Sequence, residues 1–330
     1  MQRTTGLPVK TRENMSVSEH AIFVDGNHQL HRCWRTTGSF SATPEKRVPL
    51  MLLHYFSAYA LEKRAKFGSL CFDGDDIFRY RIDPNYKIGR RTEGTGGGMD
   101  HTGPRGEGGG KTALEIKDEV YKCLQPTIRL FDLLGIPCHQ NSELEADDLM
   151  ASGAYSFTRN GDSRIYIPGR KAWIVTADKD TLQRVDKQVR VYRPEINKQP
   201  SIEWDVDRVV AEKGMKPRQF CDYQALVGDK VDDIPPILSP KKAEKLILKY
   251  GALSKLLASE EGQEIWAKHQ NEIRRNVQLV RLSYKSWAPT LEELRFFRKK
   301  PDRKRVVDEY GKLPDSYLAF EMTCTKKGLF

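Results

Sequence analysis

The chain has 330 residues, of which 38% are hydrophobic and 30% are charged, and its net charge is +10. No apolar run approaches the ~18 residues of a membrane span, and residues 1–17 lack the apolar core of a secretory signal, so we expect neither a membrane protein nor a secreted one. The six cysteines show no C-x-x-C spacing, which argues against a zinc site or a disulfide framework and favours a reducing, cytoplasmic location.

Short apolar runs alternate with helical patterns up to about residue 200. Strands are predicted at residues 21–24, 70–72, 136–138, 173–176 and 189–192, and helices at 47–66, 112–134 and 144–157. After a flexible lead at 1–17, this alternation predicts a mainly parallel, doubly wound α/β domain over residues 18–200. The glycine-rich segment 92–110 has too few apolar residues to order itself, and we expect a mobile loop there.

Strands are predicted to stop after residue 200. Five helical patterns follow, at residues 205–213, 216–227, 240–250, 252–257 and 262–282. They predict a smaller helical domain over residues 201–284. Residues 285–330 form a basic, weakly periodic extension, whose run R-K-K-P-D-R-K-R at 298–305 is interpreted equally well as solvated surface or as a DNA contact.

Acidic residues follow several predicted strands at the point where each strand ends. Because the carboxyl ends of parallel strands meet at one edge of a sheet, we expect these acids to converge there with others from the loops. The set is Asp25, Asp73, Glu145, Asp147, Asp148, Asp178, Asp180, Asp229 and Asp232. So many carboxylates in one pocket repel one another unless cations neutralise them, and their hard oxygen atoms prefer Mg²⁺ or Mn²⁺.

A pair of such ions about 4 Å apart can hold the attacking and leaving oxygens of a phosphodiester. With these acids confined to one pocket, the rest of this basic chain suits binding to a phosphate backbone. The sequence therefore predicts metal-assisted phosphodiester hydrolysis.

Each motif has another interpretation when taken alone. A single aspartate at a strand end is more often a helix cap than a metal ligand. The segment F-D-G-D-D at 72–76 is similar to the start of an aspartyl-phosphate phosphatase motif, but Ile77 stands where that motif has Thr or Val. The segment D-K-D at 178–180 could open a calcium loop, but Gln183 replaces the glycine required there.

Six motifs follow one another along the chain, namely F-V-D-G-N at 23–27, F-D-G at 72–74, D-P-N-Y-K-I-G-R-R at 83–91, E-A-D-D at 145–148, T-A-D-K-D at 176–180 and A-L-V-G-D-K-V-D-D-I-P at 225–235. In this order they resemble the 5′-3′ exonuclease and flap endonuclease family, which includes phage enzymes and the 5′-nuclease domain of bacterial DNA polymerase I. The likeness covers about residues 21–282. It implies a PIN-like nuclease core followed by a helix-three-turn-helix domain.

The resemblance also implies roles for individual residues. Two Mg²⁺ ions, for which Mn²⁺ can substitute, would be held mainly by Asp25, Asp73, Glu145, Asp147 and Asp148 on one side and by Asp178, Asp180, Asp229 and Asp232 on the other, with Asp147 able to contact both. Tyr86, Lys87 and Arg90 match the family's Tyr-Lys-x-x-Arg element. There Arg90 would hold the scissile phosphate, Lys87 would offset developing charge, and Tyr86 would stack on an unpaired base.

The DNA-contacting parts are expected on either side of this site. Residues 92–110 fall where the family has an arch over the single strand. Arg91, directly before this segment, is expected to bind DNA. In the hairpin at 235–243, Lys241 and Lys242 at a helix start would hold duplex phosphates. The family's hairpin carries glycines and can hold K⁺, whereas here both glycines are missing.

The resemblance therefore implies a monomeric 5′ nuclease of replication or repair. Its substrates would be branched, flapped or nicked DNA with a 5′ end, including RNA primers on DNA. Two other functions remain open at this point: a junction-binding protein without hydrolytic activity, and a metal-dependent ribonuclease.

Overall fold

The computed structural model describes residues 18–37, 39, 41–89, 113–161, 164–196, 198–283 and 286–326. The expectations for residues 1–17 and 92–110, and those for Arg90 and Arg91, lie outside these ranges. Within them, no helix combines the length and the apolar character that a membrane span requires.

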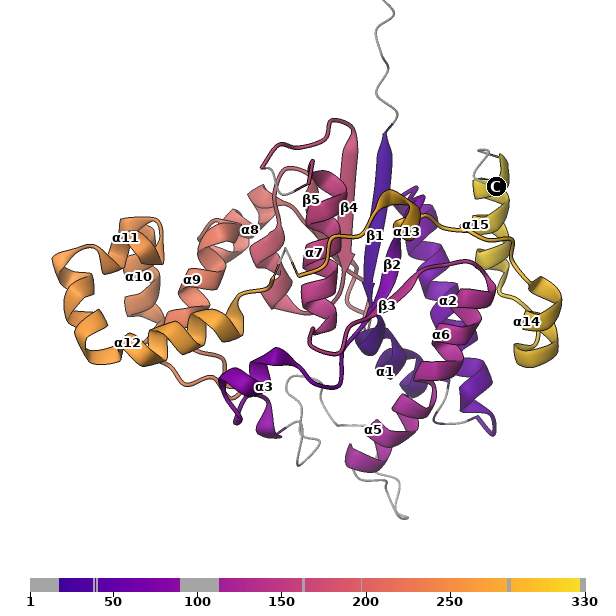
Figure 1. Cartoon of the computed structure of the whole chain (residues 1–330), viewed down its shortest axis with the longest axis horizontal. Coiled ribbons are helices and arrows are strands. Elements are labelled where there is room, and N and C mark those ends of the chain that lie inside the picture. The colour runs from indigo at the N-terminus through magenta and orange to yellow at the C-terminus, as the bar shows by residue number, and fades with distance from the viewer. Residues whose placement is uncertain are drawn as a thin grey trace, which may run out of the picture.

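A mostly parallel sheet lies at the centre of the molecule (Figure 1). Among the described residues its strand order is β3 (Cys138–Gln140), β2 (Phe67–Phe72), β1 (Glu19–Asp25), β4 (Arg170–Val175), β5 (Val189–Arg193) and β6 (Ile202–Trp204). Every neighbouring pair is parallel except β5 and β6. The predicted sheet is confirmed, but the prediction that strands stop after residue 200 is wrong, because three residues are too short to give a periodic signal.

The middle strands are buried on both faces. Residues 21–24 of β1 are all 0% exposed, which explains why they form a continuous apolar run instead of alternating with polar residues. On β2, a Cβ at Gly68 would lie 1.8 Å from the carbonyl oxygen of Ile22, and the φ of Gly68 is +143°. Only glycine fits where these two strands approach each other.

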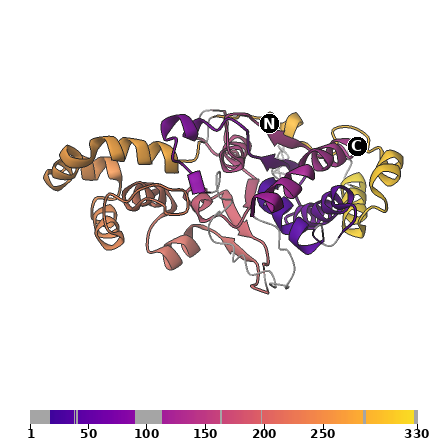
Figure 2. The same ribbon diagram turned by 90° about the horizontal axis from the view of Figure 1, so that it is seen from below.

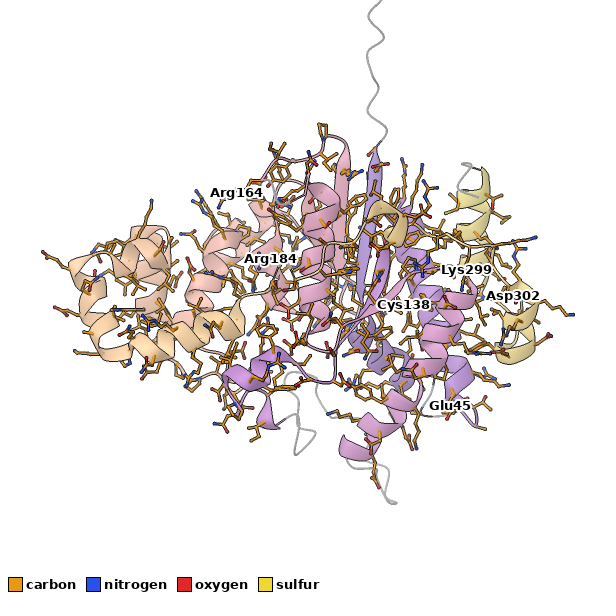
Figure 3. The ribbon with its side chains drawn as sticks, viewed as in Figure 1. Glu45, Cys138, Arg164, Arg184, Lys299 and Asp302 are labelled. Carbon is orange, nitrogen blue, oxygen red and sulfur yellow. The ribbon has the colours of Figure 1, made fainter. Side chains whose placement is uncertain are left out.

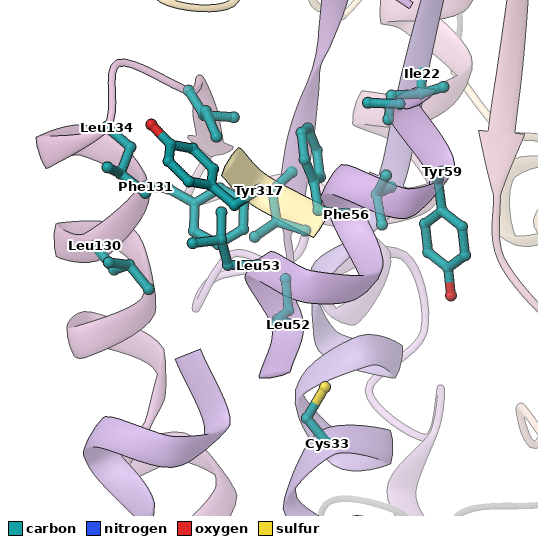
Figure 4. Packing of buried hydrophobic residues seen from close by; sticks show 14 of the residues in the cluster. Ile22, Cys33, Leu52, Leu53, Phe56, Tyr59, Leu130, Phe131, Leu134 and Tyr317 are labelled. Atoms are coloured by element: carbon teal, nitrogen blue, oxygen red, sulfur yellow. The ribbon is translucent and has the colours of Figure 1, made fainter. Parts of the chain in front are cut away.

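Helices cover both faces of the sheet, as the doubly wound prediction requires. One face packs on α1 (Gly26–Thr36), α2 (Pro44–Glu62) and α6 (Leu124–Leu133), and the other packs on α7 (Ala146–Thr158); α5 (Ala113–Lys122) packs on α1 and α6. Figure 4 shows Leu53 and Phe56 of α2 opposite Phe131 of α6. The single helix predicted at 112–134 is divided at Cys123, because Pro126 has no N–H to continue the ladder.

The helical domain has the predicted helices, with shifted ends for some of them. They are α8 (Val206–Lys213), α9 (Pro217–Val227), α10 (Pro240–Tyr250), α11 (Leu253–Leu257) and α12 (Glu260–Val280). Buried Asn276 of α12 donates to the carbonyl oxygens of Ala225 and Pro235 at 3.1 and 3.0 Å, and so fixes the hairpin between α9 and α10. Seen from below, this domain projects from one end of the molecule (Figure 2).

The C-terminal residues form helices that the sequence analysis did not predict. These are α13 (Leu291–Leu294), α14 (Arg303–Tyr310) and α15 (Asp315–Lys326). Tyr317 and Phe320 of α15 are at most 1% exposed and belong to the core cluster around α2. This part of the predicted extension therefore completes the hydrophobic core.

The basic run at 298–305 lies on the side of the molecule opposite the helical domain, where Figure 3 labels Lys299 and Asp302. Three of its cations form ion pairs, namely Lys299 with Asp132, Arg303 with Glu321 and Arg305 with Glu309. These pairs favour the interpretation of the run as protein surface.

Candidate metal centre and nucleic-acid interface

The predicted acids converge on one edge of the sheet. In Figure 1 the chain enters β1 from the top and leaves it at the bottom, where α1 and α3 (Phe78–Ile82) lie. Asp25 ends β1, Asp73 follows β2, and Asp178 follows β4 and caps the 3₁₀ helix η2 (Lys179–Arg184). Below, "inner set" means Asp25, Asp73, Glu145 and Asp147, and "outer set" means Asp178, Asp180, Asp229 and Asp232.

Asp25 is fixed by two hydrogen bonds. Its Oδ1 accepts from the backbone N–H of His28 at 2.9 Å and so caps α1, while its Oδ2 accepts at 2.9 Å from the hydroxyl of Thr176, the residue that follows the neighbouring strand β4. Burial raises the pKa of Asp25 to about 7, with further contributions from the charges of Asp73 and Asp178. A cation bound beside this carboxyl would lower its pKa and favour its ionised form.

Glu145 differs from its neighbours because basic groups surround it. Its oxygens lie 2.6 Å from Lys87 Nζ and 3.0 Å from Arg79 Nη1, and Tyr86 donates to it at 3.1 Å. Burial alone would raise its pKa, but Lys87 and Arg79 outweigh burial and bring the pKa to about 2. Glu145 is therefore ionised at neutral pH.

Asp147 is the least satisfied acid of the site. Its Oδ1 is buried and has no hydrogen-bond partner among the described residues. Burial raises its pKa well above the usual value, and the charges of Asp178 and Asp25 add to this shift. A buried, unpaired carboxylate oxygen between two other acids is costly for the protein unless a ligand contacts it.

The outer set joins the two domains. Asp178 Oδ1 accepts from the backbone N–H of Asp180 at 2.8 Å, and Gln224 of α9 donates to Asp180 at 2.5 Å. Burial raises the pKa of Asp180 to about 7, together with the charge of Asp178 and of other acids. On the hairpin, Asp229 Oδ2 lies 3.0 Å from Lys179 Nζ. The pKa of Asp229 is lowered because Lys179 outweighs its burial.

The two sets form one electrostatic unit. The charge of Asp178 raises the pKa of Asp25 and of Asp147, and the charge of Asp232 raises that of Asp180. Among the described residues, however, no group of three or more His, Cys, Asp or Glu side chains is already arranged around a metal position. Lys87, Arg79 and Lys179 occupy several of the oxygens instead. The donor type and the orphaned Asp147 oxygen fit hard divalent ions, although the side chains have to reorient to bind them.

The structure departs from two expectations for single residues. Asp148 is 0% exposed, and Arg79 binds its two oxygens at 2.5 and 3.0 Å. Its Oδ1 also accepts from the backbone N–H of Ser283 at 2.8 Å, so a metal-ligand role for Asp148 does not fit this geometry. Tyr86 is 2% exposed and its ring packs in the core of the helical domain, so it cannot stack on a base in this arrangement.

Tyr86 and Lys87 connect the inner set to the hairpin. The Tyr86 hydroxyl lies 3.1 Å from Glu145 and 3.3 Å from Asp232, and the Lys87 backbone N–H donates to the carbonyl oxygen of Asp232 at 3.0 Å. Lys87 has a φ of +52°, an unusual backbone conformation that places its ammonium group against Glu145. Both residues therefore lie next to the predicted acids.

Sequence reasoning gave no role to four residues that hold the acids in place: Arg79, Thr176, Lys179 and Gln224. Thr176 and Lys179 belong to the T-A-D-K-D motif, which was interpreted only through its aspartates. For Arg79 and Gln224 the sequence carries no signal, because their partners are remote in the chain.

The hairpin presents its basic residues to solvent. Lys241 and Lys242 are exposed in the first turn of α10, where a helix N-terminus favours phosphate groups. A Cβ at Gly228 would lie 2.3 Å from the carbonyl oxygen of Ile234, so this turn of the hairpin requires glycine although the family's other glycines are missing.

We expect the metal-free protein to lose stability as the pH rises from about 6.5 to about 8. The raised carboxyls of Asp25 and Asp180 bind protons more tightly in the folded state, so their stabilising contribution, full below about pH 4, declines progressively as the pH rises and is gone just above about pH 7. Urea denaturation in EDTA should show this decrease, and Mg²⁺ should reduce it. Three histidines whose pKa values burial lowers to about 4 act in the opposite direction, but only below about pH 6.5: His28, His31 and His139. A constant or rising stability in EDTA would contradict the prediction.

Comparisons with known proteins agree with the six motifs. The family model for the 5′-3′ exonuclease N-terminal resolvase-like domain matches residues 20–214, and the model for the 5′-3′ exonuclease C-terminal SAM fold matches residues 215–296. A 5′-3′ exonuclease of Aquifex aeolicus is 36% identical over 165 residues, which cover 48% of this chain and 50% of that protein. The thermostable DNA polymerase I of Thermus aquaticus is 25% identical over 313 residues, which cover 88% of this chain and 33% of the polymerase.

A solved structure of the phage T5 5′-exonuclease with bound zinc superposes with a TM-score of 0.62 at 16% identity, covering 93% of this chain and 99% of that one. At this identity the likeness concerns the fold. The chain spans half or less of the length of the two sequence relatives. Because the two family models together match most of the residues, the chain belongs to the 5′-3′ exonuclease family.

Proposed function

We propose that the chain is a structure-specific 5′ nuclease that hydrolyses DNA phosphodiesters with two Mg²⁺ ions. The single observation that carries this proposal is the convergence of eight acids from both domains, among them Asp147, whose buried Oδ1 has no partner among the described residues. Family membership and the metal-bound T5 relative support it. Asp148 is left out of the proposed ligands because Arg79 occupies it.

The inner and outer sets would each hold one ion, with Asp147 able to contact both. Such ions would supply the positive charge that lowers the pKa of a bound water and stabilises a leaving oxygen. The Lys87 side chain is 17% exposed and lies beside Glu145, so its ammonium group can offset negative charge that develops on the phosphate. The Tyr86 hydroxyl, which contacts both Glu145 and Asp232, would keep the two sets in register.

The substrate we propose is flapped, branched or nicked DNA with a 5′ end, with RNA primers on DNA as a further class. Lys241 and Lys242 would hold the phosphates of the duplex, while Arg90 and Arg91 would contact the strand near the cut. A basic surface around an acidic centre suits this task, since it binds the backbone without neutralising the metal ligands.

A cleavage assay tests the proposal. A 5′-labelled flap and a nicked duplex are incubated with Mg²⁺, Mn²⁺ or EDTA, and product lengths are read on a gel. We expect short 5′ products from the flap and nucleotides from the nick with either metal ion, and none in EDTA. The Asp178→Asn variant should lose cleavage and keep DNA binding. Cleavage that persists in EDTA, or faster cleavage of a matched RNA flap, would reject the proposal.

A further inference from the structure

Lys179 forms an ion pair with Asp229, one of the proposed metal ligands. It lies between Asp178 and Asp180 at the start of η2, and its Nζ is 3.0 Å from Asp229 Oδ2. The other oxygen of Asp229 already accepts from the backbone N–H of Val231 at 2.8 Å. Lys179 therefore occupies the carboxylate oxygen of Asp229 that does not accept the Val231 hydrogen bond.

Burial differs strongly between the two partners. The Lys179 side chain is 58% exposed, whereas the Asp229 side chain is 7% exposed. The lysine thus reaches from solvent onto a buried carboxylate. A flexible ammonium group in such a position binds weakly and exchanges easily, because water competes with it and its rotamers are many.

The same lysine lies among the acids of the outer set. Asp178 and Asp180 are its neighbours in the chain, and Asp229 is its ion-pair partner, so its positive charge is associated with three of the four acids of the outer set. In the described part of the site, Lys179 partly neutralises the repulsion among these carboxylates.

The inner set is arranged differently. The cations that hold Glu145 are less exposed than Lys179: the Arg79 side chain is 1% exposed and the Lys87 side chain is 17% exposed. Arg79 is also fixed by the carbonyl oxygen of Leu279 at 2.7 Å. Asp147 of the inner set meanwhile keeps an oxygen without a partner among the described residues. An ion can therefore contact Asp147 without first displacing a cation from that oxygen, whereas at Asp229 it has to displace Lys179.

We propose that Lys179 is a resident counter-ion of the outer set, which the outer metal ion displaces from Asp229 when it binds. The proposal rests on the two-metal function above and makes Lys179 a positioning residue rather than a catalytic one. It explains why the two ions should bind with unequal affinity: the inner ion fills an unsatisfied position, whereas the outer ion replaces an existing cation.

Isothermal titration calorimetry of the full chain with Mn²⁺, in the absence of DNA, tests the displacement of Lys179 directly. We expect two binding events, and Lys179→Gln should tighten the weaker one about fivefold, the amount that a partly exposed ion pair contributes. Lys179→Arg keeps the charge and should leave both events within about twofold of the original chain. Lys171→Gln, an exposed lysine at the other end of β4, is the matched control for lost charge and should have no effect.

Asp178→Asn in the same titration separates the two proposals. If the weaker event disappears in Asp178→Asn but is unchanged or weakened in Lys179→Gln, the outer set binds metal and the role of Lys179 is wrong. If Asp178→Asn keeps every Mn²⁺ binding event of the original chain, the two-metal function itself fails. Tightening in Lys179→Gln, together with loss in Asp178→Asn, supports both.

Discussion

Asp147→Asn is expected to abolish cleavage while stabilising the metal-free protein. The buried Oδ1 of Asp147 has no partner among the described residues, and burial with the charges of Asp178 and Asp25 raises its pKa well above the usual value. The unfolded chain has no such penalty, so an uncharged amide should raise the free energy of unfolding by about 1 to 2 kcal/mol. Cleavage should fall more than about a hundredfold, the upper range for residues that merely support a metal ligand.

The pH dependence makes this prediction specific. The penalty grows with pH while the folded carboxyl keeps a proton that the unfolded one has lost, so the gain in stability should be larger at about pH 8 than at about pH 5. Urea denaturation in EDTA measures the gain, and a flap assay with Mg²⁺ measures the loss of activity. Asp118→Asn, at an exposed position of α5, is the matched control and should change stability by less than about 0.5 kcal/mol. A destabilised Asp147→Asn protein, or one that still cuts at a tenth of the original rate, would contradict the prediction that Asp147 binds a metal ion and destabilises the metal-free protein.

The sheet could be predicted because its physics is local. A strand buried on both faces has to be apolar at every position, and residues 21–24 are so in the sequence and in the structure. Helix α1 was missed for the opposite reason: most of its residues are polar, and its start is signalled only by Asp25. That aspartate was interpreted as a metal ligand alone, whereas one of its oxygens also caps the helix.

The site could be predicted as a set of acids but not as an arrangement. Asp147 and Asp148 are neighbours at the start of α7, and successive helical residues point about 100° apart. Which of the two faces the metal centre depends on Arg79, whose position lies 69 residues away in the chain. No spacing rule within the segment at 145–148 contains that information. The same holds for Gln224, which reaches Asp180 from the other domain.

Asp148→Asn should destabilise the protein, whereas Asp147→Asn should stabilise it, because the change at Asp148 breaks a buried ion pair with Arg79. Arg79 is 0% exposed and also donates to the carbonyl oxygens of Leu279 and Arg281, so it joins α3, α7 and the end of α12. Among the described residues, removing the charge of Asp148 leaves this arginine with Glu145 as its one acidic partner. We expect a loss of about 3 to 5 kcal/mol in the free energy of unfolding, measured by urea denaturation.

The metal centre should survive this change, because Asp148 has no oxygen to spare for an ion. Well below the lowered melting temperature, the Asp148→Asn protein should bind Mn²⁺ with the original stoichiometry, whereas Asp147→Asn should not. Arg79→Met combined with Asp148→Leu should be less destabilised than the sum of the single changes, since no uncompensated charge remains. If Asp148→Asn instead lost a Mn²⁺ ion at unchanged stability, Asp148 would be a metal ligand after all, and its pairing with Arg79 would have to open when the ion binds.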